Sequence, residues 1–266
     1  MDFRLASNRF IALATIVLSG IGFGYELYDG GSFGEAVSRG AQFGVGVFLA
    51  WAIARELDPD HPGSATAATF AGAALLFTGS PRLGASLALL LVFRIVLRST
   101  GRLPTFVDLI FVAGLAVYCA RTPDGLPAAM ALGVALVVDS RLPEPAPSYT
   151  LPLGVVIALG VIAVGAYFGS FSNVWATPSM LQWVCLALVA VAVISLRVPA
   201  PESKNDRHRP LNRTRLVSAT WLGVWAGVAT VFLTGGAAVP GLSPLWAPVV
   251  AVALTRRIPT RTAPRN

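Results

Sequence analysis

Nine charged or titratable residues lie where three apolar stretches end, and together they could do chemistry. Three acids and a histidine follow the second apolar stretch, three arginines end the fourth, and an aspartate with an arginine ends the sixth. Carboxylates can bind Mg²⁺, and arginines bind phosphate or carboxylate groups. This candidate ligand-binding cluster consists of Glu56, Asp58, Asp60, His61, Arg94, Arg98, Arg102, Asp139 and Arg141.

The acids of this cluster are placed unfavourably for their own helix and therefore need a partner. Glu56 and Asp58 come at the C-terminal end of an expected helix, where the helix dipole favours cations. Arg94 and Arg98 are four residues apart, so they share one helix face. We expect at least one of these two arginines to lie within ion-pair reach of an acid between residues 56 and 60.

A purely structural interpretation of the same residues stays open. Asp58-Pro59 and Asp60-His61-Pro62 are turn-forming sequences, and arginines beside apolar stretches set membrane orientation. Arg94 is expected about one turn inside its helix, where an arginine usually faces protein or water or extends to the membrane interface. The cluster is therefore either a ligand site or a set of turn and topology signals.

Few other patterns in the chain indicate chemistry. The two cysteines, Cys119 and Cys185, lie in apolar stretches without metal-ligand spacing. The sequence contains no Walker, nucleophile-elbow or zincin motif. We therefore expect no bound metal and no cofactor. Thr105 and Asp108 are spaced as a capping box at the start of a helix.

Long uncharged apolar stretches must position the cluster. Hydrophobic residues make up 55% of the 266 residues and charged residues 12%, and the mean hydropathy is +0.69. Residues 145–196 and 216–255 contain no Asp, Glu, Lys or Arg. Apolar runs of about 18 or more residues are typical of membrane spans, because only a helix or a closed barrel satisfies its backbone in lipid. The sequence predicts an all-α polytopic integral membrane protein, with residues 1–266 forming a single transmembrane domain.

We predict about ten transmembrane helices arranged as hairpins. Those between residues 63 and 139 are short, so they either tilt to span the bilayer or are re-entrant. Residues 199–215 are expected to form a hydrophilic loop. Two pairs of small residues, Gly40 with Gly44 and Gly223 with Gly227, are expected at helix contacts. The expected helices cover 10–28, 40–55, 63–79, 83–98, 105–120, 125–139, 150–171, 178–197, 215–235 and 241–256.

Basic residues are distributed unequally between the two sides of this arrangement. Of the 20 Lys and Arg residues, 16 fall on one side and only Arg39, Arg82 and Arg121 on the other, while Arg94 lies within a helix. The positive-inside rule then predicts a cytoplasmic 199–215 loop and cytoplasmic N- and C-termini in a bacterial or archaeal plasma membrane. The net charge of +7 indicates contact with anionic lipid headgroups rather than nucleic acid. Protein partners stay open.

Three functions remain in competition. A small permease is favoured by the number of helices and the lack of catalytic motifs, although few polar residues fall near mid-membrane. An enzyme acting on a phospho- or isoprenoid-lipid at the cytoplasmic face would use the acids and arginines of the cluster. A non-catalytic subunit or scaffold needs neither a permeation path nor a catalytic cluster. A cavity lined by Arg94, Glu56 and Asp58 favours a binding site or an enzyme, one reaching mid-membrane favours a permease, and a solid core favours a scaffold.

Overall fold

A computed structural model describes residues 5–144, 146–171, 203, 210–235 and 238–255. Within these ranges the chain forms helices and no strands, which confirms the all-α class for this part of the protein. The helix expected over 178–197 lies outside the described residues. The helices are α1 (Ala6–Tyr28), α2 (Phe33–Leu57), α3 (Pro62–Leu76), α4 (Leu83–Leu97), α5 (Phe106–Ala120), α6 (Leu126–Asp139), α7 (Thr150–Tyr167), α9 (Arg213–Thr234), α10 (Ala238–Gly241) and α11 (Ser243–Thr255).

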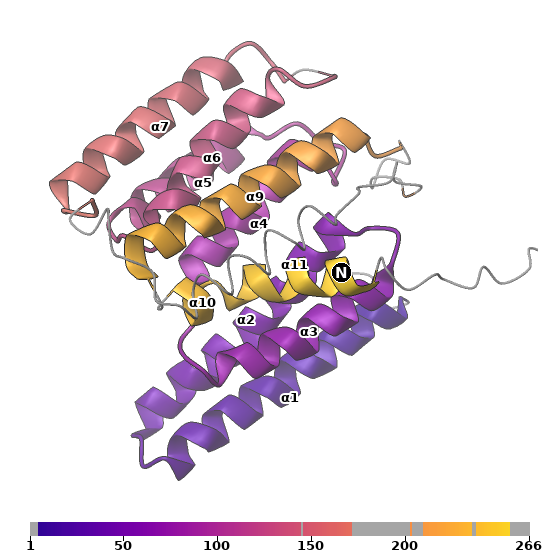
Figure 1. The fold of residues 1–266 in the computed structure, drawn as a ribbon, viewed down its shortest axis with the longest axis vertical. Helices are drawn as coiled ribbons and strands as arrows, with labels where there is room; N and C mark the ends of the chain where they lie inside the picture. Colours follow the sequence, from indigo (N-terminus) through magenta and orange to yellow (C-terminus); the bar gives the residue numbers. More distant parts are fainter. Residues whose placement is uncertain (1–4, 145, 172–202, 204–209, 236–237, 256–266) are drawn as a thin grey trace, which may run out of the picture.

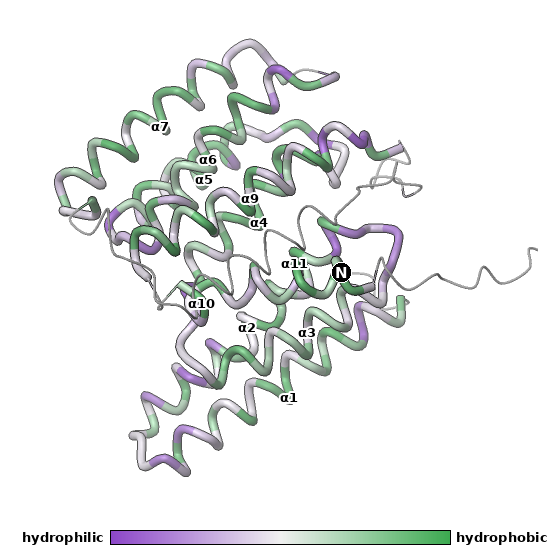
Figure 2. The backbone as a smooth tube through the Cα atoms, in the orientation of Figure 1, coloured by the Kyte–Doolittle hydropathy of each residue, from purple (hydrophilic) through white to green (hydrophobic). Residues whose placement is uncertain are grey.

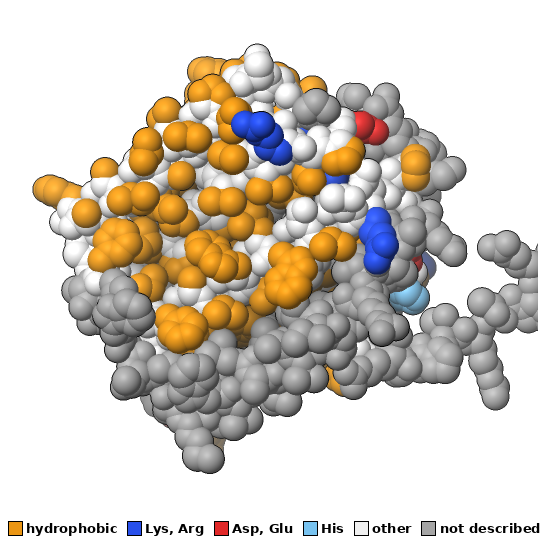
Figure 3. Space-filling view, turned by 45° about the horizontal axis from the view of Figure 1, so that its top comes forward, with side chains coloured by type: hydrophobic (Ala, Val, Ile, Leu, Met, Phe, Trp, Pro, Cys, Tyr) orange, Lys and Arg blue, Asp and Glu red, His pale blue; other side chains and the backbone are white. Residues whose placement is uncertain are grey.

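Four of these helices, α1, α2, α7 and α9, are long and apolar enough to cross a membrane. Helices α4, α5, α6 and α11 are apolar but shorter, with 13–15 residues. Hydrophilic residues collect near the helix ends, and hydrophobic residues follow the helix bodies (Figure 2). Figure 3 shows hydrophobic side chains covering much of one face. Exposed apolar surface of this extent is unusual for a soluble protein and suits contact with lipid.

The helices form two adjoining groups (Figure 1). Helices α1, α2, α3 and α11 pack together, and α4, α5, α6, α7 and α9 form the second group. Contacts of α4 with α2, and of α11 with α4 and α9, join the two groups. The largest buried hydrophobic cluster extends through both groups and includes Ile53, Phe93, Leu132 and Leu245.

Helices α1 to α7 run in alternating directions between two ends of the bundle, as the hairpin prediction requires. At the end that we call the basic end, the last turn of α4 contacts the ends of α2 and α6. At the opposite end, Arg82 before α4 pairs with Asp124 before α6, and Arg39 of α2 donates to Ser80 after α3. Each of α3, α4, α5 and α6 therefore runs from one end of the bundle to the other.

Capping residues decide where two of the helices begin. The expected box at Thr105 is confirmed: Thr105 N–H donates to Asp108 Oδ2 at 2.7 Å, and Asp108 N–H donates to Thr105 Oγ1 at 3.3 Å. The expected start of the second helix at residue 40 is wrong, because α2 begins at Phe33. Ser32 and Glu35 form a second capping box there, which stabilises a polar first turn ahead of the apolar stretch.

The glycine pairs lie at helix contacts, as predicted. A Cβ on Gly40 would meet the Ser19 carbonyl of α1 at 2.8 Å, and one on Gly223 would meet the Phe93 ring of α4. Gly227 faces Trp246 of α11 in the same way. Small residues at these positions let the helices approach closely.

Candidate functional site

The predicted cluster begins with an ion pair between α2 and α4 at the basic end. Arg94 Nε donates to Glu56 Oε1 at 3.1 Å, which confirms the expected pairing of an arginine of α4 with an acid of residues 56–60. The Glu56 side chain is 10% exposed and that of Arg94 is 46% exposed. Because water reaches the guanidinium, this pair is expected to add little to stability.

The other members from the α2–α3 turn are engaged close by. The Asp58 carboxylate is buried, and its Oδ1 lies 3.0 Å from His61 Nδ1. Asp60 Oδ1 accepts a hydrogen bond from Ser203 N–H at 2.7 Å. These contacts order the turn between the helices, as the turn-forming interpretation predicted. No group of three or more His, Cys, Asp and Glu side chains able to hold a metal ion occurs in the described part of the chain.

A second, more buried network lies where α4, α6 and α9 meet. Asp139, fully buried at the end of α6, accepts two hydrogen bonds from Arg98: Nε to Oδ1 at 2.9 Å and Nη2 to Oδ2 at 3.1 Å. Arg215 Nη1 reaches the same Oδ1 at 2.5 Å. We call Arg98, Asp139 and Arg215 the Asp139 network. The sequence-derived cluster is therefore divided, since Arg98 pairs with Asp139 and Arg94 with Glu56.

Arg215 completes this network and was missed in the sequence-derived cluster. Its side chain is only 4% exposed, and it also donates to the carbonyl oxygens of Val96, Pro143 and Glu144 at 2.7–3.1 Å. One signal was available in the sequence. Arg215 lies in the first turn of α9, where the helix dipole disfavours a cation, so it needed a compensating acid just as Glu56 needed an arginine.

Backbone geometry also sets Arg98 apart from its neighbours. It ends α4 with φ 52° and ψ 42°, the left-handed conformation that usually requires glycine. A side chain in this conformation costs about 1–2 kcal/mol, and the same residue makes the bidentate contact with Asp139. Arg102 and Arg141, the remaining members of the predicted cluster, are exposed and make no ion pair with described residues.

A cavity of about 260 Å³ adjoins the Asp139 network at the basic end. Its wall joins the end of α4, the α6–α7 connection and the start of α9. The residues around this basic-end cavity are Leu97, Arg98, Pro143, Glu144, Pro210, Leu211, Asn212 and Arg215.

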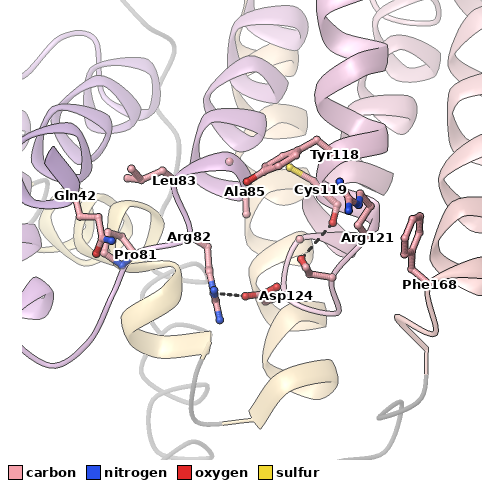
Figure 4. Close-up of a pocket in the computed structure, with 13 residues that line it drawn as sticks. Gln42, Pro81, Arg82, Leu83, Ala85, Tyr118, Cys119, Arg121, Asp124 and Phe168 are labelled. Atoms are coloured by element: carbon pink, nitrogen blue, oxygen red, sulfur yellow. Dashed lines mark hydrogen bonds and ion pairs between the residues drawn. The ribbon is translucent and has the colours of Figure 1, made fainter. Parts of the chain in front are cut away.

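A larger cavity of about 510 Å³, which we call the vestibule, lies at the opposite end (Figure 4). The turns before α4 and α6 form part of its wall, where Arg82 pairs with Asp124. The guanidinium of Arg121 stacks over the Phe168 ring at 5.0 Å. The vestibule is lined by Gln42, Pro81, Arg82, Leu83, Gly84, Ala85, Tyr118, Cys119, Arg121, Thr122, Asp124, Gly125 and Phe168.

Unpaired polar atoms lie at and just beyond the vestibule wall. Gln42 Oε1 is buried and has no hydrogen-bond partner among the described residues. Ser86 Oγ, one residue further into α4 than the lining Ala85, is likewise buried and unpaired. Buried polar atoms normally have partners, so these two atoms are exceptions within the described residues.

The sequence did not reveal the vestibule, because its residues come from four separate segments and share no local pattern. The sequence did offer one signal. Only three basic residues were assigned to the sparsely charged side, and Arg82 and Arg121 are two of them. Neither cavity is lined by Arg94, Glu56 or Asp58, the arrangement that would have favoured a site between α2 and α4.

Comparisons with protein-family models, with curated proteins and with solved structures give no match.

Proposed function

We propose that this protein is a permease of the plasma membrane, with about ten transmembrane helices and its basic end in the cytoplasm, and that it passes a small polar solute. The observation that carries the proposal is the pairing of a polar vestibule at one end with a tightly closed network at the other. Alternating access needs such an arrangement, with a solute site open to one side while the other side is sealed.

The positions of the chain around residues 172–202 support the ten-helix topology. Ser170, just after α7, donates to the carbonyl of Ala120 at the opposite end. Ser203 contacts Asp60 at the basic end. These two described residues therefore lie at opposite ends of the bundle, which agrees with the sequence-based prediction of one helix over 178–197 between them.

The vestibule has groups suited to a solute that carries a negative charge. Arg121 makes no ion pair with any described residue, whereas Asp124 is already neutralised by Arg82. Gln42 Oε1 adds an acceptor for a hydroxyl or amino group of the same solute. Ser86 supplies a hydroxyl beyond the vestibule wall.

The Asp139 network would act as the closure at the basic end. It ties α4, α6 and α9 together through charge-assisted hydrogen bonds that water hardly reaches. Opening this end requires these hydrogen bonds to break and the three helix ends to separate. For solute to drive this change, it would have to bind more tightly to the state that is open at the basic end than to the state that is closed there.

Thiol accessibility tests the permease proposal directly. In a chain whose own cysteines are replaced by serine, Gln42→Cys should react from outside with a membrane-impermeant thiol reagent. Ser86→Cys should react with a small polar thiol reagent applied from either side, because a permeation route passes it. Ala68→Cys, buried between α3 and α11, is the matched control and should not react.

The scaffold remains the second candidate, because the buried core between the two ends is largely apolar. It predicts that Ser86→Cys reacts from neither side although Gln42→Cys still reacts from outside.

Reporter fusions in the Arg102 and Asp124 turns check orientation separately. A cytoplasmic signal at Arg102 and an external signal at Asp124 are expected, and signals on the same side would contradict the topology.

A further inference from the structure

The basic-end cavity has one guanidinium edge that the protein leaves unused. Arg98 directs Nε and Nη2 at Asp139, and no described residue accepts a hydrogen bond from its Nη1. The bidentate contact fixes the plane of the guanidinium, so Nη1 is held in place and not free to swing. The side chain is 13% exposed and lines the cavity.

The surroundings of this edge favour an anion. Two guanidiniums share the single carboxylate of Asp139, which leaves an excess positive charge in the Asp139 network. The first turn of α9, capped by Asn212, also faces the cavity and adds the positive end of its dipole. Glu144 is the acid in the cavity wall, but it is exposed and makes no ion pair with a described residue.

The size of the cavity suits a compact group. Its 260 Å³ exceeds by several times the share of about 30 Å³ that one water molecule takes in the liquid. The apolar residues of its lining are Leu97, Pro143, Pro210 and Leu211. A group bound there would be partly shielded from water, which strengthens its interaction with the guanidinium.

We infer that the basic-end cavity binds a phosphate group, with Arg98 Nη1 donating to a phosphate oxygen. Arginine is suited to this role because its planar fork can hold Asp139 with one edge and a phosphate oxygen with the other. The phosphate can belong to a soluble molecule or to the headgroup of a membrane lipid. This site is separate from the vestibule and stands whether or not the protein is a permease.

Binding is tested on the purified full-length protein with two probes. Inorganic phosphate is titrated by calorimetry in detergent, and phosphatidic acid is added in nanodiscs and compared with phosphatidylcholine. Arg98→Gln should weaken binding about tenfold or more, the usual effect of losing one charge-assisted hydrogen bond. Leu211→Trp should do the same by filling the cavity while it keeps every charge. Glu144→Gln should tighten binding, because it removes an acid from the wall.

Arg102→Gln is the matched control, since it removes the same charge from an exposed position in the same turn. If both probes bind and only the cavity variants weaken them, the site accepts phosphate from either source. Binding of phosphatidic acid alone assigns a lipid headgroup, and binding of inorganic phosphate alone assigns a soluble phosphate. The inference is overturned if neither probe binds, or if Arg102→Gln weakens binding as much as Arg98→Gln. Unchanged binding in Leu211→Trp would also overturn it.

Discussion

Asp139→Asn is the substitution that should test the architecture of the basic end most severely. Asparagine keeps the shape of the side chain but removes the negative charge that Arg98 and Arg215 share. Arg215 is 4% exposed and cannot turn to water, because its other donors are held by three backbone carbonyls. The variant therefore buries two cations without a counter-charge.

The expected loss of stability follows from how deeply the charges are buried. Removing one partner of a buried ion pair costs about 3–5 kcal/mol, because the remaining charge stays desolvated. For a chain of this size each kcal/mol lowers Tm by about 2–4 °C, so Tm should fall by roughly 6–20 °C. Arg98→Gln should cost less, because Asp139 would keep Arg215.

Thermal unfolding of the purified protein, followed by intrinsic tryptophan fluorescence at one fixed heating rate, measures these effects. Glu56→Gln is the control, since it neutralises an acid of the same end whose partner Arg94 is half-exposed. A pair whose guanidinium is reached by water contributes about 0–1 kcal/mol, so this control should shift Tm by a few degrees at most. If Asp139→Asn melts no lower than Glu56→Gln, the burial argument for the Asp139 network is wrong.

Four further substitutions, one of them a control, have outcomes that follow from local geometry, and each is checked by the same thermal unfolding. Gly154→Ala should lose about 1–3 kcal/mol, because its Cβ would lie 2.7 Å from the Gly133 carbonyl. Gly160→Ala on the same helix has open space at its Cβ and should be neutral or stabilising; equal losses in both variants would contradict the close α6–α7 contact. Thr105→Ala should lose about 1 kcal/mol through loss of the α5 cap. Ser86→Ala should preserve or raise stability, because it removes a buried hydroxyl with no partner among the described residues. A loss above about 1 kcal/mol would mean that this hydroxyl does make a hydrogen bond.

The helix boundaries that the sequence predicted well are those where turn or capping residues interrupt an apolar stretch. Helix α5 starts where Thr105 and Asp108 predicted, and α6 ends at Asp139, where the apolar pattern stops. The start of α2 was predicted too late because its first turns are polar. Helix α2 begins where Ser32 caps it, and hydropathy alone does not detect a cap that lies ahead of a polar first turn.

The two ion networks show which parts of a site a sequence can give. A pair between an arginine of α4 and an acid of residues 56–60 was predicted, because acids at a helix C-terminus oppose the helix dipole and need a cation nearby. Two members of the Asp139 network, Arg98 and Asp139, were predicted as part of the cluster without their pairing, and Arg215 was missed. Arg215 lies 76 residues after Asp139, and what brings them together is the packing of α9 against α4 and α6. The vestibule depends on packing in the same way.

That separation along the chain sets an order of assembly during synthesis. Arg98 precedes Asp139 by 41 residues, so the ribosome completes this pair first. Arg215 follows 76 residues after Asp139, a delay on the order of 4–15 s at about 5–20 residues per second. Synthesis therefore provides Asp139 with one arginine partner, Arg98, before it provides the second. The residues whose carbonyls accept from Arg215, namely Val96, Pro143 and Glu144, are likewise all synthesised before α9, so every contact of this side chain joins a late part of the chain to an earlier one.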